Sequence, residues 1–123
     1  MTKNKETFII KRNKEASIIG DIQFSKLSSS PLVIFCHGYK GYKDWGAWNL
    51  VSDEFVKNDI SFCKFNFSLN GGTLDNPIDF PDLDAFGRNT YSTEINDVLS
   101  VVDYIKDKYK DYFSCDNIIL IGH

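Results

Sequence analysis

The strongest constraint on the fold is an uninterrupted apolar run, Leu32-Val33-Ile34-Phe35-Cys36, which leads directly into His37-Gly38. A strand with one wet face alternates apolar and polar residues, whereas this run is apolar at every position. A strand of that kind has to be covered on both faces, as a central strand of a parallel sheet is covered by helices. We therefore predict that residues 1–123 belong to a single domain with an α/β fold.

Two segments lie before this run, and the second of them, residues 16–24, has the alternation that the run lacks. Residues 8–12 and 16–24 predict two strands, and the polar stretch 13–15 between them is short enough for a hairpin. The sheet is thus expected to begin with an antiparallel pair.

A helix is predicted after the central strand, over residues 46–57. Trp48, Val51 and Phe55 have the i, i+3, i+7 spacing of one helix face, and Asp44 is a candidate N-cap. Trp48 is therefore expected in the core.

The rest of the chain continues the alternation of strands and helices. A strand is predicted over 60–67, a loop over 68–89, a helix over 91–109 and a last strand over 117–121. An apolar stripe marks the long helix, and Asp97 is placed away from that stripe. The stripe consists of Ile95, Val98, Leu99, Val102 and Ile105. The expected order is a hairpin followed by β-α-β-α-β in a mostly parallel sheet.

Composition narrows the classes of function. The chain has 14 basic and 17 acidic residues, no basic stripe and no apolar stretch of about 20 residues, so neither nucleic acid nor membrane is an expected partner. Its three cysteines include no CxxC pair, and Cys36 and Cys63 lie within apolar runs. We expect buried thiols and a cytoplasmic location. A homo-oligomer remains open.

Three other kinds of α/β site fit the loops poorly. Residues 38–41 lack the G-x-G core of a dinucleotide-binding loop, and Ala47-Trp48 stand where a P-loop needs Lys and Ser or Thr. A calcium loop starting at Asp82 would have Phe86 and Thr93 at ligand positions. Two histidines without a nearby carboxylate pattern make a poor metal site, so no metal or organic cofactor is expected.

Two stretches carry a family resemblance. His37-Gly38-Tyr39-Lys40-Gly41 resembles the H-G-x-x-G loop of α/β hydrolases, and the longer run 36–46 is similar to a bacterial branch near the dienelactone hydrolases and serine-aminopeptidase-like proteins. Ile118 to His123 looks like the strand that enters the G-x-S-x-G nucleophile elbow. The resemblance covers most of the chain from Pro31 onward.

The resemblance implies roles for particular residues. The backbone N–H of Tyr39 is expected to serve as an oxyanion-hole donor, supported by His37, Gly38 and Gly41. Gly122 and His123 are expected to open the elbow, with the nucleophile immediately after His123. The acid and the catalytic histidine would follow later, so 1–123 is expected to be the N-terminal half of the domain and inactive alone. The amide of residue 39 and the turn beyond residue 123 should then converge.

The activity that the resemblance implies is hydrolysis of a small-molecule carboxylic ester, or a related acyl bond, through an acyl-enzyme. A Cys or Asp nucleophile, as in dienelactone hydrolases, dehalogenases or epoxide hydrolases, stays open, as do a peptidase and a non-catalytic binding protein. Tyr39 and Trp45 are candidates for the substrate pocket. Lys40 and Lys43 are expected in solvent, and His37 and His123 are expected to be structural.

Overall fold

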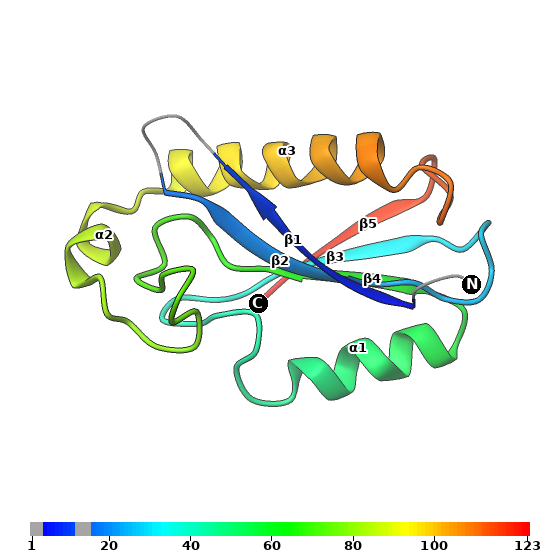
Figure 1. The fold of residues 1–123 in the computed structure, drawn as a ribbon, viewed down its shortest axis with the longest axis horizontal. Helices are drawn as coiled ribbons and strands as arrows, with labels where there is room; N and C mark the ends of the chain where they lie inside the picture. The colour runs from blue at the N-terminus through cyan, green and yellow to red at the C-terminus, as the bar shows by residue number, and fades with distance from the viewer. Residues whose placement is uncertain (1–3, 12–15) are drawn as a thin grey trace.

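The computed structural model describes residues 4–11 and 16–123. Figure 1 shows one twisted sheet with α1 on one face and α3 on the other. The strands are β1 (Lys5–Ile10), β2 (Ile18–Gln23), β3 (Leu32–Cys36), β4 (Ser61–Phe65) and β5 (Ile118–Gly122), and the helices are α1 (Trp48–Lys57), α2 (Leu83–Arg88) and α3 (Tyr91–Lys108).

The sheet has the order β1-β2-β4-β3-β5. The pairs β1–β2 and β2–β4 are antiparallel, and β3 is parallel to both β4 and β5. This confirms the predicted hairpin followed by β-α-β-α-β. Arg12 and the connection 13–15 lie outside the described residues.

The two faces of β3 explain its unbroken apolar run. Val33 and Phe35 belong to the core cluster that α1 covers, and Leu32 and Ile34 belong to the larger cluster beneath α3. All four are at most 4 % exposed. Burying a side chain of this size contributes about 1.5–3 kcal/mol, so this one strand anchors both layers.

A close approach of Phe8 to Gly20 fixes the register of the first hairpin. The two residues are paired across β1 and β2, and a Cβ on Gly20 would lie 2.2 Å from the tip of the Phe8 ring. The ring, which is 2 % exposed, occupies the space that any other residue at position 20 would fill.

Helix α1 packs as its spacing predicted, with Trp48, Val51 and Phe55 against the sheet. Its start differs from the prediction. The N-cap residue is Ala47, without a side-chain hydrogen bond, so the prediction of Asp44 as the cap is wrong. The Asp44 carboxylate instead takes part in a buried ion cluster.

Helix α3 is rotated relative to the predicted stripe. Ile95 and Leu99 are 61 % and 58 % exposed, whereas Asp97, Val101 and Ile105 are fully buried. The buried face therefore follows an i, i+4 series that starts at an aspartate. Asp97 was predicted to be exposed because it is acidic, but hydrogen bonds with Ser68 stabilise it in a buried position.

The predicted loop 68–89 contains a short helix, α2. Asp82 caps it, because its carboxylate accepts from the Ala85 N–H at 3.0 Å. Arg88 and Asp84 form an exposed i, i+4 ion pair at 3.2 Å. These local signals are visible in the sequence, but six residues are too few for a hydrophobic period.

Candidate active site

The site is built where parallel strands end. The loops after β3 and β4, together with Gly122-His123 at the end of β5, lie at the carboxyl edge of the sheet. The chain leaves β3 toward α1 on one face, while α3 covers the other. Ligands of open α/β sheets bind at such a divergence of loops.

The loops after β3 and β5 touch at Gly38 and His123. A Cβ on Gly38 would lie 2.9 Å from Nδ1 of His123 and 3.0 Å from its carbonyl oxygen. The His123 N–H donates to the Cys36 carbonyl at 3.1 Å, and the His123 ring meets Trp48 edge-on at 5.2 Å. The structure thus brings together the two stretches that the sequence singled out.

A tight turn carries residues 38–41. The Gly41 N–H donates to the Gly38 carbonyl at 2.9 Å, and Lys40 has a left-handed φ of 61°. A Cβ on Gly41 would lie 2.8 Å from the Gly38 oxygen, so this corner has no room for one. Within residues 4–11 and 16–123, no hydrogen-bond acceptor takes the backbone N–H of Tyr39. That amide is available to a ligand.

His37 is a structural residue in a defined tautomer. Its Nε2 accepts from the Phe67 N–H at 3.1 Å, so Nδ1 must carry the proton that it donates to the Gly38 carbonyl at 2.9 Å. Burial lowers the pKa of the imidazole, and the bond to Gly38 opposes that shift. His37 therefore ties the Gly38 turn to the end of β4 as a neutral ring.

A cleft of about 640 Å³ lies over these loops. Its wall combines the backbone of the Gly38 turn with aromatic rings and one carboxylate. The lining includes Gly38, Tyr39, Asn70, Phe86, Tyr91, Glu94 and His123. The Tyr39 ring is 83 % exposed and lies 5.5 Å from the Phe86 ring. Trp45, the second pocket candidate from the sequence, is half exposed and does not line this cleft.

Two asparagines after β4 hold the loop after β3. Asn66 accepts from the Lys43 N–H at 2.6 Å and donates to the Pro77 carbonyl at 3.0 Å. Asn70 donates to the Gly41 carbonyl at 3.3 Å. Sequence reasoning did not assign these residues, although two asparagines four positions apart, just after a buried strand, are a signal that could have found them.

Four charged residues form a buried cluster, here called the charge square: Asp21 on β2, Lys64 on β4, and Lys43 with Asp44 in the loop after β3. Lys43 Nζ lies 2.6 Å from Asp21 and 2.7 Å from Asp44, and Lys64 Nζ lies 3.0 Å and 2.8 Å from the same two carboxylates. Lys43 is 5 % exposed, so the prediction that it is solvated is wrong. Lys40, by contrast, is exposed.

The charge square changes the titration of its members. Burial would raise the pKa of Asp44, but hydrogen bonds and attraction from Lys43 and Lys64 outweigh it and lower the pKa to about 2. The pKa of Asp21 is lowered against its burial by the same two lysines. The pKa of Lys43 is raised, because its two carboxylates outweigh the effect of burial. All three groups are therefore charged near neutral pH.

Asp97 holds the end of β4 from the α3 side. Its carboxylate accepts from the Ser68 N–H at 2.8 Å and the Ser68 hydroxyl at 3.1 Å. Burying a carboxylate without hydrogen bonds costs a large amount of free energy, and the two bonds from Ser68 offset part of that cost. Ser68 and Asp97 therefore fix where the chain turns from β4 toward the cleft.

Cys36 and Cys63 have no nucleophilic setting. Burial raises the pKa of Cys63, which is fully enclosed, and raises that of Cys36 to about 11. Cys36 is half-buried rather than fully buried. Neither is a thiolate at neutral pH. The described ranges also contain no group of three or more metal-ligating side chains and no helix long and apolar enough to span a bilayer.

Solved structures similar to this chain include several hydrolases. An Est1E structure from Butyrivibrio proteoclasticus has a TM-score of 0.67 and 17 % identity, over 95 % of this chain and 40 % of that chain. A thermostable carboxyl esterase from Bacillus coagulans has a TM-score of 0.73 and 14 % identity, over 99 % and 37 %. A dienelactone hydrolase from Anabaena variabilis has a TM-score of 0.68 and 10 % identity, over 98 % and 52 %.

The chain has an α/β-hydrolase fold. This confirms the fold class predicted from the two motif-bearing loops. No protein-family model matches the chain, and no curated protein matches it. The chain spans about half or less of the length of these similar structures. At these identities the α/β-hydrolase likeness establishes the fold alone.

Within this α/β-hydrolase fold, the cleft shared by the Gly38 turn and His123 is the candidate active site. The sequence identified the turn and the end of β5. It missed three sets of contacts that fix the loops around the cleft, which are the asparagine pair, the charge square and the Ser68–Asp97 contact. All three join residues distant in sequence.

Proposed function

We propose that the full-length protein is a serine hydrolase that cleaves a small-molecule carboxylic ester through a covalent acyl-enzyme. In this proposal the nucleophile occupies the position after His123, and the Tyr39 N–H is one donor of the oxyanion hole. The second donor is the N–H of the residue that follows the nucleophile.

The contact between Gly38 and His123 carries this proposal. It sets the turn that bears the unpaired Tyr39 N–H beside the end of β5, where a strand-to-helix turn presents a nucleophile in this fold. Attack on an ester carbonyl places negative charge on the carbonyl oxygen. A preorganised N–H pointing at that oxygen lowers the barrier by about 3 kcal/mol.

The wall of the cleft supports an acyl group with apolar or aromatic character. Tyr39, Phe86 and Tyr91 are aromatic residues of the cleft lining. One similar structure is an Est1E complex with ferulic acid, an aromatic acid, at 19 % identity and a TM-score of 0.70 over 94 % of this chain and 42 % of that chain. Ester cleavage with an aromatic or extended acyl group is consistent with both observations.

Labelling of the full-length protein with a fluorophosphonate probe, beside a p-nitrophenyl acetate assay, tests the proposal. A serine hydrolase is labelled at the residue after His123 and turns the ester over, and replacing that residue with Ala abolishes both signals. Labelling of the residue after His123 by iodoacetamide instead would indicate a Cys nucleophile, and halide release from a haloalkane would indicate Asp. If the protein is not labelled by either probe and turns over none of these substrates, the result would favour a binding protein.

The segment 1–123 alone is expected to be inactive and poorly folded. Its edge strand β5 exposes Ile119 and Leu120, at 47 % and 54 %. An open apolar edge of this kind pairs readily with other chains. A cooperative thermal transition of the isolated segment, with no aggregation, would contradict this expectation.

A further inference from the structure

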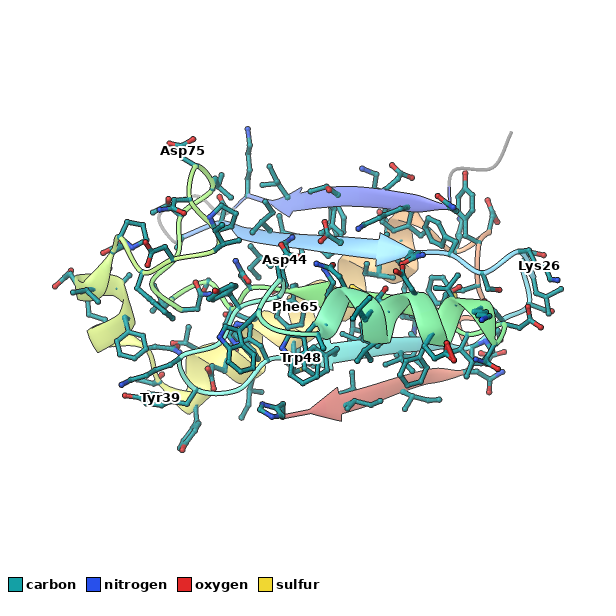
Figure 2. The ribbon with its side chains drawn as sticks, turned by 90° about the horizontal axis from the view of Figure 1, so that it is seen from below. Lys26, Tyr39, Asp44, Trp48, Phe65 and Asp75 are labelled. Carbon is teal, nitrogen blue, oxygen red and sulfur yellow. The ribbon has the colours of Figure 1, made fainter. Side chains whose placement is uncertain are left out.

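The charge square joins the candidate oxyanion loop to the sheet. Two corners, Asp21 and Lys64, face each other in register on β2 and β4. The other two, Lys43 and Asp44, are consecutive residues of the loop after β3. Figure 2 looks onto the α1 side of the sheet and shows Tyr39 farther out from the strands than Asp44.

We propose that Asp21 and Lys64 are positioning residues of the active site, which act through Lys43 and Asp44 to hold the Tyr39 N–H in place for the transition state. This inference rests on the proposed function. It goes beyond it by assigning a role in the reaction to two sheet residues outside the cleft lining.

The geometry of the square leaves no member replaceable. Each ammonium contacts both carboxylates, and each carboxylate contacts both ammoniums, at 2.6–3.0 Å. The second oxygen of Asp21 also accepts from the Thr7 hydroxyl at 3.0 Å. The four charges sum to zero, so removing one leaves an unbalanced charge in a site that is nearly closed to water.

A short chain of contacts leads from the square to the Tyr39 amide. Lys43 is held by its side chain in the square and by its N–H on Asn66. Two residues earlier, the Gly41 carbonyl is held by Asn70 and the Gly41 N–H closes the turn on Gly38. The turn that carries Tyr39 is therefore tied down on its C-terminal side, while His37 ties it on the other.

Charge suits this role better than apolar packing would. Hydrophobic contact has no preferred direction, so a loop resting on an apolar surface can slide. Two directed ion pairs, Lys43 with Asp21 on β2 and Asp44 with Lys64 on β4, join the loop to two different strands and specify one position. Displacement of a catalytic group by about 1 Å can cost about a hundredfold in rate, so such fixing matters for an amide donor.

The test compares variants of the full-length protein, with kcat expressed per active site titrated by a fluorophosphonate. Asp44→Asn keeps the size of the least buried corner and removes its charge. Lys64→Met keeps the length of the central corner. Both are expected to lower kcat per site by about 10- to 100-fold with KM nearly unchanged, because a transition-state interaction is weakened.

Ser52→Ala is the matched control. The Ser52 hydroxyl donates to Gln23 at 2.8 Å on the same side of the sheet, in a contact that does not involve the loop. This variant should lower the melting temperature and leave kcat per site unchanged. If Asp44→Asn and Lys64→Met likewise lower only the melting temperature, the square is merely structural and the inference is wrong.

Two further readouts keep the outcomes separate. If Lys64→Met does not fold, Asp44→Asn decides, because that carboxylate is partly solvated at 25 % side-chain exposure. If the wild-type protein is neither labelled nor active, the proposed function fails instead. Hydrogen exchange then still tests the positioning claim, since the amides of residues 38–44 should exchange faster in Asp44→Asn than in Ser52→Ala, and equal exchange would overturn it.

Discussion

Gly38 and His123 lie so close that a single methyl group would separate them. The α-carbon of Gly38 faces the backbone of His123, and an added Cβ would stand 3.0 Å from the His123 carbonyl oxygen. Backbone cannot move aside as a flexible side chain can. The two loops of the candidate site therefore meet only while position 38 is glycine.

Gly38→Ala should reduce kcat of the full-length protein by about a hundredfold, because the Tyr39 turn and the end of β5 are pushed apart. The control is Gly87→Ala, since a Cβ on Gly87 meets nothing within 4 Å. That change should leave activity intact and stabilise α2 by about 0.5–1 kcal/mol, as Ala is favoured over Gly in a helix. Steady-state kinetics and urea unfolding of both variants check the pair. Wild-type kcat in Gly38→Ala would contradict the proposed contact.

The neutral state of His37 predicts how stability responds to mild acid. Its folded pKa is lowered by burial, so below about pH 6.5 the unfolded chain takes up a proton that the folded protein resists. Stability from this group is present above that pH and is lost as pH falls, by at most about 1.4 kcal/mol per pH unit.

His37→Gln tests this response, because the Gln oxygen can accept from the Phe67 N–H and does not titrate. Urea unfolding at several values between about pH 7.5 and about pH 5 should give a smaller pH slope for the variant than for the wild type. Equal slopes would assign the pH dependence to other groups.

The charge square predicts a second transition at lower pH. The pKa of Asp44, about 2, lies below the value near 3.9 of a free Asp. The stability that this carboxylate adds is therefore present above about pH 4 and lost as the pH falls toward about 2. Thermal unfolding across that range should show a steeper loss for the wild type than for Asp44→Asn. Parallel curves would mean that the carboxylate is not paired in the folded protein.

Removing the Asp97 carboxylate should destabilise the protein strongly. Asp97→Ala leaves the buried Ser68 N–H and hydroxyl without this acceptor, at an expected cost of about 3 kcal/mol. Asp103→Ala changes an exposed aspartate on the same helix and should stay within about 0.5 kcal/mol of the wild type. Urea unfolding measures both values, and similar stability of the two variants would rule out the Ser68 contact as a major support.

Elements whose own residues carry a clear hydrophobic pattern were predictable from the sequence. The run 32–36 and the spacing of Trp48, Val51 and Phe55 report burial directly, and both have the predicted surroundings. The loops that resemble those of α/β hydrolases were predictable because their glycines are required by nearby atoms. At Gly41, for example, a Cβ would collide with the Gly38 carbonyl oxygen. In each case the physical cause lies within a few residues of the pattern that reveals it.

Elements that depend on distant partners were not predictable. Lys43 and Asp97 have the composition of a wet surface, and what buries them is a partner more than twenty residues away. Residue type gives the cost of burying a charge but not the presence of a compensating partner. The same limit led to placing Asp44 as a helix cap, where a local role was the simplest one.

The contacts at both ends of the stretch 38–42 also determine where insertions and deletions can be tolerated. His37 and Lys43 fix the two ends of the stretch 38–42, so an inserted or deleted residue there has no slack to absorb it. The stretch 73–79 is joined mainly by hydrogen bonds among its own neighbours, such as Thr73 with Asn76. Among descendants of this sequence, insertions and deletions should therefore gather in 73–79 and be absent from 38–42.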